Sequence, residues 1–308
     1  MFTLLETISP HSTHDYLGYV YNHPRFLAHN NDQTQIHFYA HRDDRILAHT
    51  AFSVKEGVAH SPLRLPFGGL EYNQKLDDGA LRAILSEVEW RLKAKNVAEI
   101  NYHQPPNSYQ SDVSLNKAFE SLGYGILQER LFHGIRVNEH DLIDRMHKME
   151  QRKFNMCFSN GAEFKALVGD DAIHAFKWIE KNRRLAKKPA SMSWEDLKDA
   201  KALNPEAYLV FGVFMDGQML ASTVLVRANR QSVYHFLPTS LVGAEKFKKY
   251  SPMVFLVNGL YGWCQENGVE LLDFGTLYVD GTLKVSLVQF KEHLGGEESR
   301  ALSWRKEI

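Results

Sequence analysis

The residues best suited to chemistry lie near the end of the chain, in LLDFGTLYVDGTLKVSLVQFKEHLGG at 271–296. Its apolar start predicts a buried strand, and Asp273 stands where that strand ends. A carboxylate placed there can accept or orient a proton as a general base, an effect worth about 10²- to 10⁴-fold in rate. Gly275 lets backbone approach a ligand closely, and Lys291 offers a cation to a phosphate or a terminal carboxylate. The structural alternatives are a turn-capping Asp273 and a solvated helix lysine.

A second strand, QSVYHFLPTS at 231–240, supplies two further candidates for proton transfer. Tyr234 and His235 are neighbours, so their side chains point to opposite faces of a strand and only one can face a site. His235 ordinarily titrates near neutral pH, and a structural role is open for both. Where this strand separates from its neighbour, free backbone N–H groups could stabilise a negative charge that develops on a substrate. The sequence does not locate those donors.

A lysine cluster precedes a predicted helix in VGAEKFKKYSPM, where Lys246, Lys248 and Lys249 stand ahead of Ser251 and Pro252. Serine is a good N-cap and proline a good first-turn residue. A cationic helix entrance of this kind can bind a phosphate. We therefore expect these lysines and Ser251 to bind a phosphate group.

A further basic run, KNRRLAKKPASMSWEDL at 181–197, has two interpretations. Its cations, Arg183 among them, could meet a phosphate or a tRNA backbone. The favoured interpretation is a helix end, then a loop, then a new helix capped at Ser193 with acidic residues in its first turn.

Composition indicates an ordinary globular protein of 308 residues, with 44% hydrophobic and 12% aromatic content. Its 36 Lys and Arg nearly balance 37 Asp and Glu, which argues against a nucleic-acid coat or a membrane-surface protein. Two cysteines are too few for a disulfide framework, and no apolar run approaches the roughly 20 residues of a membrane span. The histidines show no repeated metal-ligand spacing. We expect a cytoplasmic protein with no bound metal.

Two pairs of segments match one another in the same order and at nearly the same offset. Residues 35–62 and 208–238 each read as three antiparallel strands with a tight polar turn, and residues 81–102 and 254–275 each read as a helix followed by a strand. Antiparallel hairpins are common enough to align by chance, which is the alternative. The matches favour two copies of one unit.

This repeat predicts an α+β protein with a mixed α/β sheet in each half. The expected domains are 1–137 and 162–308, each a mostly antiparallel twisted sheet flanked by helices. Between them, residues 138–161 carry apolar side chains near helical spacing and predict a connecting helix.

An antiparallel meander, then a helix, then a strand that ends at the reacting centre resembles the GNAT acyltransferase fold. Two such units joined by a helix with the basic pair Arg152-Lys153 resemble the FemAB-like branch of that superfamily. The similarity covers most of the chain and is densest in SPLRLPFGGL at 61–70 and in the DFG at 273–275 followed by FKEHLGG at 290–296. DFG alone is weak, because no other kinase motif accompanies it.

The FemAB-like branch contains peptidoglycan aminoacyltransferases and acyltransferases of surface-glycan clusters. The resemblance therefore implies transfer of an activated acyl group onto the amine of an amino sugar, an amino acid or a peptidoglycan-like acceptor. It implies that the second half holds the machinery, with Lys291 near the donor, and that a degenerate first half shapes the acceptor side. Gly68, Gly69, Arg152 and Gly275 are the residues expected to contact substrate.

One departure concerns the donor. GNAT enzymes hold the coenzyme A pyrophosphate on a glycine-rich turn, and no such glycine pattern precedes Ser251. The donor stays open among aminoacyl-tRNA, acyl carrier protein and acyl-CoA held in another way. The alternatives to an acyltransferase are a catalytically inactive tandem GNAT-fold binding module and an enzyme of another class. A DNA partner is not expected.

Overall fold

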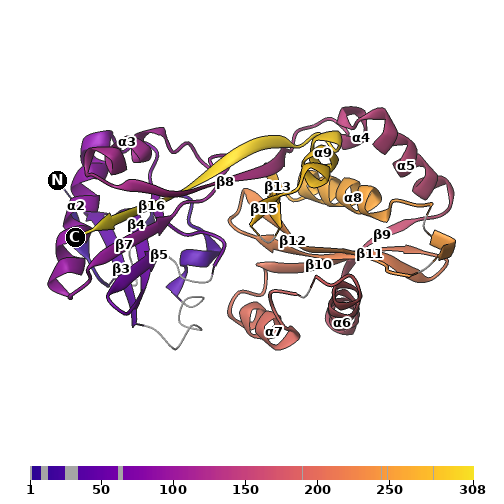
Figure 1. Ribbon diagram of the computed structural model, residues 1–308, viewed down its shortest axis with the longest axis horizontal. Coiled ribbons are helices and arrows are strands. Elements are labelled where there is room, and N and C mark those ends of the chain that lie inside the picture. The colour runs from indigo at the N-terminus through magenta and orange to yellow at the C-terminus, as the bar shows by residue number, and fades with distance from the viewer. Residues whose placement is uncertain are drawn as a thin grey trace. The chain divides into compact units, whose positions relative to one another are not determined.

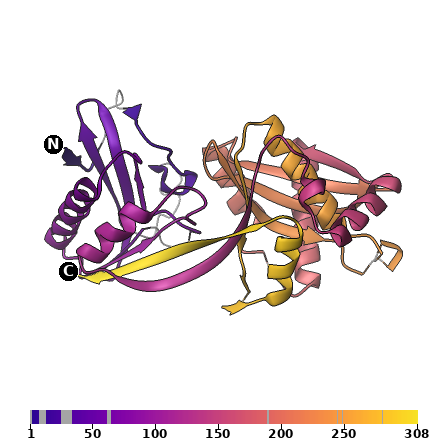
Figure 2. The same cartoon turned by 90° about the horizontal axis from the view of Figure 1, so that it is seen from above.

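The computed structural model describes residues 2–7, 13–24, 34–61, 65–188, 190–243, 245–247, 249–279 and 281–308. The chain forms two compact units, the first from Met1–Leu131 with Ser299–Ile308 and the second from Phe132–Glu298. The chain passes between them within strand β8 (Gly125–Arg136) and again within strand β16 (Glu297–Glu307) (Figure 2).

The first unit contains a sheet in the order β1-β3-β4-β5-β7-β16, and β2 and β6 also pair with β4. Its remaining elements are β1 (Thr3–Leu5), β2 (Thr13–His14), the 3-10 turn η1 (Val20–Asn22), β3 (Thr34–Arg42), β4 (Arg45–Lys55), β5 (Val58–Ser61), β6 (Leu70–Tyr72), α2 (Asp78–Ala94), β7 (Glu99–His103) and α3 (Val113–Ser121). Strands β3, β4 and β5 are antiparallel, and β7 lies parallel to β5. The predicted meander and the predicted helix and strand of this half are confirmed.

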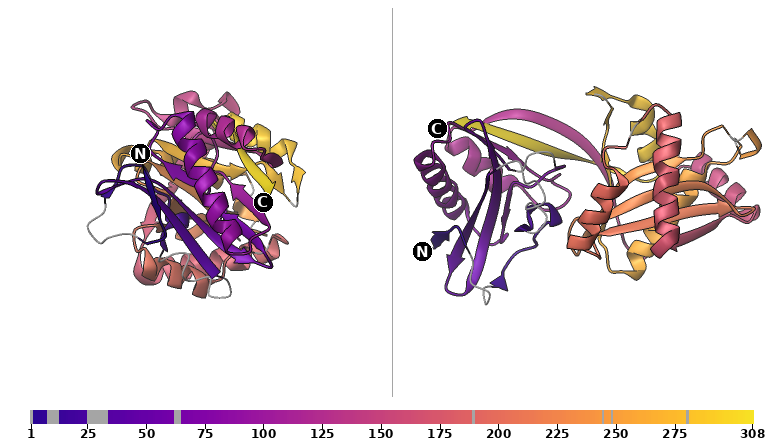
Figure 3. Two further views of the ribbon diagram at one scale, coloured as in Figure 1. Left: turned by 90° about the vertical axis from the view of Figure 1, so that its left-hand side faces the viewer. Right: turned by 90° about the horizontal axis from the view of Figure 1, so that it is seen from below.

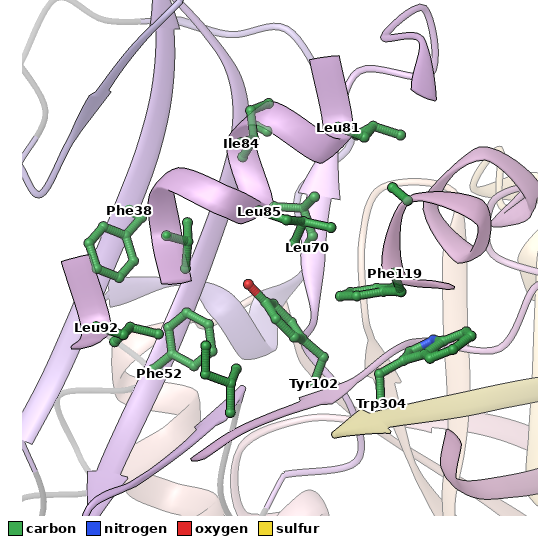
Figure 4. Close-up of a cluster of buried hydrophobic side chains, with 14 of the residues drawn as sticks. Phe38, Phe52, Leu70, Leu81, Ile84, Leu85, Leu92, Tyr102, Phe119 and Trp304 are labelled. Atoms are coloured by element: carbon green, nitrogen blue, oxygen red, sulfur yellow. The ribbon is translucent and has the colours of Figure 1, made fainter. Parts of the chain in front are cut away.

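The core of the first unit lies between this sheet and helices α2 and α3 (Figure 3, left). One face of α2 is apolar at helical spacing, with Leu81, Ile84, Leu85, Val88 and Leu92 buried. Figure 4 shows four of these side chains, Leu81, Ile84, Leu85 and Leu92, in one cluster with Phe38, Phe52 and Tyr102 of the sheet. Phe119 of α3 stacks on Trp304 of β16 with 5.3 Å between ring centroids. The last strand of the chain therefore completes the core of the first unit.

The second unit contains a sheet in the order β8-β13-β12-β11-β10-β9. Its other elements are α4 (Leu142–Arg145), α5 (Lys148–Ser159), β9 (Glu163–Leu167), α6 (Gly169–Leu185), α7 (Trp194–Leu203), β10 (Tyr208–Met215), β11 (Gln218–Arg227), β12 (Ser232–Ser240), the 3-10 turn η2 (Glu245–Phe247), α8 (Pro252–Glu266), β13 (Leu271–Thr276), β14 (Tyr278–Val279), β15 (Thr282–Leu283) and α9 (Val285–His293). Figure 1 shows α6 and α8 on opposite faces of this sheet. Strands β10, β11 and β12 form the predicted meander, and β13 is parallel to β12.

Residues 132–137, expected in the first domain, belong to the second unit. The observed units differ from the expected domains in two further places. Helix α5, expected inside a connecting helix at 138–161, packs on α8 and buries Cys157 in the core of the second unit. Residues 299–308, expected in the second domain, belong to the first because Trp304 is buried there. Burial of apolar side chains decides membership in both cases.

The expected start of a helix at Ser193 is confirmed for α7. The Ser193 Oγ accepts a hydrogen bond from the backbone N–H of Asp196 at 3.2 Å, and the Asp196 carboxylate accepts one from the backbone N–H of Ser193 at 2.9 Å. This reciprocal capping box satisfies two N–H groups that the helix leaves without partners.

Candidate active site

The candidate site lies in the second unit, where two parallel strands stop pairing. Strands β12 and β13 pair from Ser232 opposite Leu271 to Tyr234 opposite Asp273. β12 continues along β11 through a shift in register, and Leu237 adopts a left-handed backbone with φ of 54°. That conformation is uncommon for a residue other than glycine. β13 continues along β8 instead. The separation expected from the sequence therefore begins just past Tyr234 and Asp273.

Asp273 and Gly275 form a tight turn at the end of β13. Asp273 is only 2% exposed, and its Oδ1 accepts a hydrogen bond from the backbone N–H of Gly275 at 2.7 Å. This is the turn-capping contact that the sequence left open. Gly275 has φ of 73°, and a Cβ added there would lie 2.6 Å from a ring carbon of Tyr234. Only glycine fits this turn without displacing the tyrosine.

Lys291 reaches the same turn from helix α9. Its side chain is 6% exposed, and its Nζ donates hydrogen bonds to the carbonyls of Gly275 at 2.8 Å and Thr276 at 2.9 Å. Burial lowers the pKa of Lys291 to about 8, and the Asp273 charge opposes that shift. An ammonium has three N–H donors, so one remains after these two bonds. Lys291 is not a solvated helix lysine.

Tyr234 and His235 lie on opposite faces of β12, as expected. Burial raises the pKa of Tyr234 well above its ordinary value, and the charge of Asp273 adds to the shift. Tyr234 therefore keeps its hydroxyl proton. On the other face, burial lowers the pKa of His235 to about 3, with a further contribution from Lys291. The His235 ring packs edge-on against Phe274 at 6.2 Å. His235 is thus a neutral imidazole beside Lys291.

Two side chains near this turn were not among the predicted site residues. His133 of β8 is 1% exposed, and burial followed by the Lys291 charge lowers its pKa. The Arg183 guanidinium of α6 donates to the carbonyl of Pro238 at 3.5 Å and counteracts the upward pKa shift of Tyr234. No sequence motif indicated a role for His133. Arg183 lies in the basic segment 181–197, which was interpreted as the end of a helix.

A pocket of about 330 Å³ lies at the N-terminal end of α8. Its lining is mostly apolar and consists of Leu220, Ser240, Leu241, Gly243, Phe247, Tyr250, Ser251, Pro252, Met253 and Phe290. Pro252 occupies the first turn of α8 as expected, but the Ser251 side chain makes no capping hydrogen bond. The capping role predicted for that side chain is therefore wrong. Phe290 directly precedes Lys291, so α9 contributes to both the pocket and the turn.

Two lysines of the predicted cluster, Lys246 and Lys249, do not line this pocket. Lys246 is exposed and pairs with Asp216 at 2.8 Å. Lys249 is exposed as well, with its Nζ 5.0 Å from the ring centroid of Tyr250. Exposed ion pairs contribute little free energy, so Lys246 could exchange Asp216 for an anionic ligand. Lys248 lies outside the described residues.

Three residues predicted to contact substrate lie on other elements. Gly68 and Gly69 precede β6, and Arg152 lies on α5. Gly69, with φ of 67°, turns the chain after Gly68 into β6, and a Cβ on it would lie 2.7 Å from Gln104. Arg152 is exposed on α5. A binding role for Gly68, Gly69 and Arg152 stays a prediction.

The Gly-Gly pair after Lys291 ends helix α9. Gly295 has φ of 86°, and a Cβ on Gly296 would lie 2.7 Å from the carbonyl oxygen of Lys291. The backbone N–H of Gly296 donates to that carbonyl at 2.9 Å. The two glycines thus terminate the helix that carries Lys291.

Two further features concern the described part of the chain. It contains no group of three or more His, Cys, Asp or Glu side chains arranged to hold a metal ion. Within the same residues, no helix combines the length and the apolar character needed to cross a membrane.

Comparisons with known proteins agree with this fold. Residues 151–284 match the family described as acetyltransferase (GNAT) domain. No curated protein sequence matches the chain. The crystal structure of FemX is similar with a TM-score of 0.73 at 12% identity, covering 94% of each chain. The structure of L-PGS from Bacillus licheniformis has a TM-score of 0.60 at 13% identity, covering 95% of this chain and 93% of that one.

A tandem GNAT protein from the clavulanic acid biosynthesis pathway is also similar, with a TM-score of 0.50 at 12% identity and coverage of 89% of this chain and 83% of its own. Identities this low establish the fold alone. The likeness extends over nearly the whole chain, and the family match falls in the unit that holds the candidate site. The FemAB-like resemblance expected from the sequence is confirmed at the level of the fold: nearly the whole chain is similar in structure to FemX, and residues 151–284 match the family described as acetyltransferase (GNAT) domain.

Proposed function

We propose that the protein is a transferase that moves an activated acyl or aminoacyl group onto an amine. The acceptor would be an amino sugar, an amino acid or a peptidoglycan-like amine. One observation carries the proposal. Asp273 and Lys291 hydrogen-bond to the backbone of Gly275, and the Tyr234 ring lies where a Cβ on Gly275 would stand. This is the point where β12 and β13 separate. An acid, a protonated hydroxyl and a cation thus surround one strand end in a GNAT fold.

The chemistry assigns a different role to each of these side chains. The Asp273 carboxylate would accept or orient the proton of the attacking amine, which contributes about 10²- to 10⁴-fold in rate. Lys291 would direct its remaining N–H donor to the negative charge that develops on the attacked carbonyl, or to an anionic group of the donor. Tyr234 keeps its proton and could donate it to the leaving group.

The pocket at the start of α8 is the proposed donor site. Its apolar lining suits an acyl group or an extended arm of the donor, and among the described residues no cationic side chain lines it. The anionic part of the donor would then meet the N-terminal end of α8, with Ser251, or the exposed Lys246 and Lys249. Aminoacyl-tRNA, acyl carrier protein and acyl-CoA all remain candidate donors.

The acceptor side is assigned to the first unit by resemblance. Gly68 and Gly69 of that unit are proposed to contact the acceptor, and Arg152 on α5 of the second unit is a further proposed substrate contact. A cytoplasmic location also stays a prediction.

A second candidate function is a tandem GNAT-fold binding module without catalysis. Its support is that Asp273 and Lys291 already make hydrogen bonds within the protein, to the N–H of Gly275 and to two carbonyls. Such contacts also arise where a side chain only holds a turn together.

A transfer assay separates the two functions. The wild-type protein is incubated with an amino sugar or a peptidoglycan-like amine and, in turn, a labelled aminoacyl-tRNA, a labelled acyl carrier protein and a labelled acyl-CoA. Label appearing in the amine with any donor supports the transferase. No transfer and no rise in Tm with any donor would favour the binding module, because a ligand at about 100 times its Kd should add roughly 2.7 kcal/mol.

A further inference from the structure

Arg183 occupies a position of helix α6 that faces the sheet of the second unit. The buried side chains of this helix recur at helical spacing, at Ala172, Ala175, Phe176, Ile179 and Asn182. Arg183 follows Ile179 by four residues, so the same period places it on the sheet side. It is only partly exposed, whereas the next residue, Arg184, is exposed. A cation thus stands where the pattern favours an apolar side chain.

Hydrogen bonds fasten the end of α6 to the strand that carries Tyr234. Asn182 is 3% exposed, and its Oδ1 accepts a hydrogen bond from the backbone N–H of Val242, just past β12, at 3.0 Å. The Nη1 of Arg183 donates to the carbonyl of Pro238, on β12 itself, at 3.5 Å. These two contacts hold the guanidinium over β12.

Tyr234 lies within reach of two opposite charges on this face of the sheet. Val233 and Leu272 are paired in register and are both buried in the core beneath α8, so the next pair, Tyr234 and Asp273, points to the α6 side. Burial is the largest cause of the raised pKa of Tyr234; Asp273 adds to the rise and Arg183 opposes it. A carboxylate and a guanidinium therefore both act on one hydroxyl.

The same face of β12 is accessible along its length. Tyr234 and Phe236 are partly exposed and Pro238 is exposed, whereas the residues between them are buried. The rings of Tyr234 and Phe236 lie 5.8 Å apart. These three side chains form one row, which runs from the strand position paired with Asp273 to the carbonyl that Arg183 contacts.

We propose that Arg183 binds a carboxylate of the acceptor, and that the amine which this protein acylates is a free amino acid. This proposal rests on the proposed function, in which the amine lies at Asp273. An amino acid carries an ammonium and a carboxylate in one small molecule, and this face of the second unit offers an acid and a guanidinium to match them. An amino sugar such as glucosamine supplies no negative charge for the guanidinium.

The chemistry of a guanidinium suits this role. Its five N–H donors form a rigid fork that can bond to both oxygens of a carboxylate. Burial lowers the pKa of Arg183, opposed by Tyr234, and a guanidinium still stays charged in proteins. In the reaction the amino nitrogen bonds to the acyl carbon, and the bond from that carbon to the oxygen or sulfur of the donor breaks. One proton of the amine ends on that oxygen or sulfur, and the carboxylate is unchanged.

Binding to the full chain tests the inference without a transfer reaction. Each standard L-amino acid and its carboxamide is added separately, and its Kd is measured by isothermal titration calorimetry. At least one amino acid should bind, and its carboxamide, which lacks the negative charge, should bind about 10- to 100-fold more weakly. Binding of no amino acid, or equal binding of the acid and the carboxamide, overturns the inference.

Two neighbouring arginines provide a matched pair of variants. Arg183→Gln should raise the Kd of the amino acid by about 10- to 100-fold and leave that of the carboxamide unchanged. Arg183→Lys should restore part of the loss, because it restores the charge without the fork. Arg184→Gln, an exposed change on the same helix, should alter neither Kd. If Arg183→Gln does not fold, Arg183→Lys and the comparison of acid with carboxamide in the wild-type protein still decide. An Arg183→Gln protein that keeps the wild-type preference for the acid overturns the assignment to Arg183.

Transfer assays separate this inference from the proposed function. With a labelled donor, the wild-type protein should acylate the amino acid that binds and should leave its carboxamide and glucosamine nearly unlabelled. Acylation of glucosamine at an equal rate would overturn the inference and support the proposed function. Carboxylate-dependent binding of an amino acid, with no transfer from any donor, would overturn the proposed function and support the carboxylate site.

Discussion

Helices α3 and α9 occupy matching places in the two units, each between the strand after the long helix and the long strand that follows. Their sequences are related, VSLNKAFESLG and VSLVQFKEHLG. Both have a leucine at the C-cap, Leu122 and Leu294, followed by a glycine with positive φ, 79° at Gly123 and 86° at Gly295. The backbone frame is therefore the same in both copies.

The side chain at one matching position differs completely. Phe119 of α3 is fully buried and packs 5.0 Å from Tyr102 and 5.3 Å from Trp304. Lys291 of α9 is buried too, but it is an ammonium that donates to two carbonyls. An apolar residue fills this place in one copy, and burying a charge costs free energy. The frame does not need the cation, which favours a role for Lys291 beyond folding.

The two copies also differ in a polar side chain on the matching strands β7 and β13. Asn101 of β7 stands opposite His60, and its side chain donates to Glu99 at 2.8 Å. Asp273 of β13 stands opposite Tyr234 in the matching pair of strands. The first copy thus has an amide where the second has an acid.

The largest expected effect follows from that acid. Asp273→Asn should lower turnover by about 10²- to 10⁴-fold, because the amide cannot accept the amine proton. Steady-state kinetics measure it, and Asp170→Asn, an exposed change on α6, is the matched control. Turnover equal to wild type would remove Asp273 from the mechanism and erase this difference between the copies.

The second prediction concerns the apolar counterpart of Lys291. Phe119→Ala should destabilise the first unit by about 3–5 kcal/mol, because it leaves a cavity between Tyr102 and Trp304. Urea unfolding followed by tryptophan fluorescence measures the change. A loss below about 1 kcal/mol would mean that Phe119 does not support this core.

The third prediction uses the pKa of Lys291. The folded-state pKa of about 8 lies below the ordinary 10.5, so the unfolded chain binds more protons between these values and stability should rise with pH there. The rise should total roughly 3 kcal/mol. Urea unfolding from pH 7 to 10.5 should show it in the wild-type protein and show less of it in Lys291→Met. Equal curves would place Lys291 in a solvated environment.

The smallest effect separates backbone strain from packing at the DFG turn. Gly275→Ala should cost about 1–3 kcal/mol for its positive φ, plus the clash with Tyr234. Gly281→Ala has nearly the same φ, 74°, and no atom within 4 Å of the added Cβ. The loss of unfolding free energy in Gly281→Ala therefore measures the backbone strain alone. Subtracting it from the loss in Gly275→Ala leaves the cost of the clash with Tyr234. Equal losses in the two variants would show that Tyr234 does not press on Gly275.

Much of the fold followed from local pattern. The meanders and the helix-strand units were predicted because alternating and helical periodicity are visible in one sequence. The meeting of Asp273, Gly275 and Lys291 was predicted from motif spacing and resemblance. The return of β16 to the first unit was missed because it depends on where Trp304 is buried, which periodicity does not reveal.

Contacts across strands were the other limit. Side-chain hydrogen bonds join Glu71 of β6, His49 of β4 and His37 of β3. The sequence does not specify the register of these three strands, so these contacts were not predicted. His133 lies near Lys291 because β8 pairs with β13, a pairing between distant segments. The missing capping hydrogen bond of Ser251 was not foreseen, because serine before proline favours a cap in most helices.

The central claim is that the strand end of the second unit catalyses transfer to an amine. Its most direct test is the single-turnover rate of Lys291→Met at saturating donor, beside wild type and the exposed control Lys284→Met at the N-cap of the same helix. The account predicts a rate about 10²- to 10³-fold lower for Lys291→Met alone, with an unchanged circular dichroism spectrum. A rate within about threefold of wild type in a folded Lys291→Met protein would contradict it.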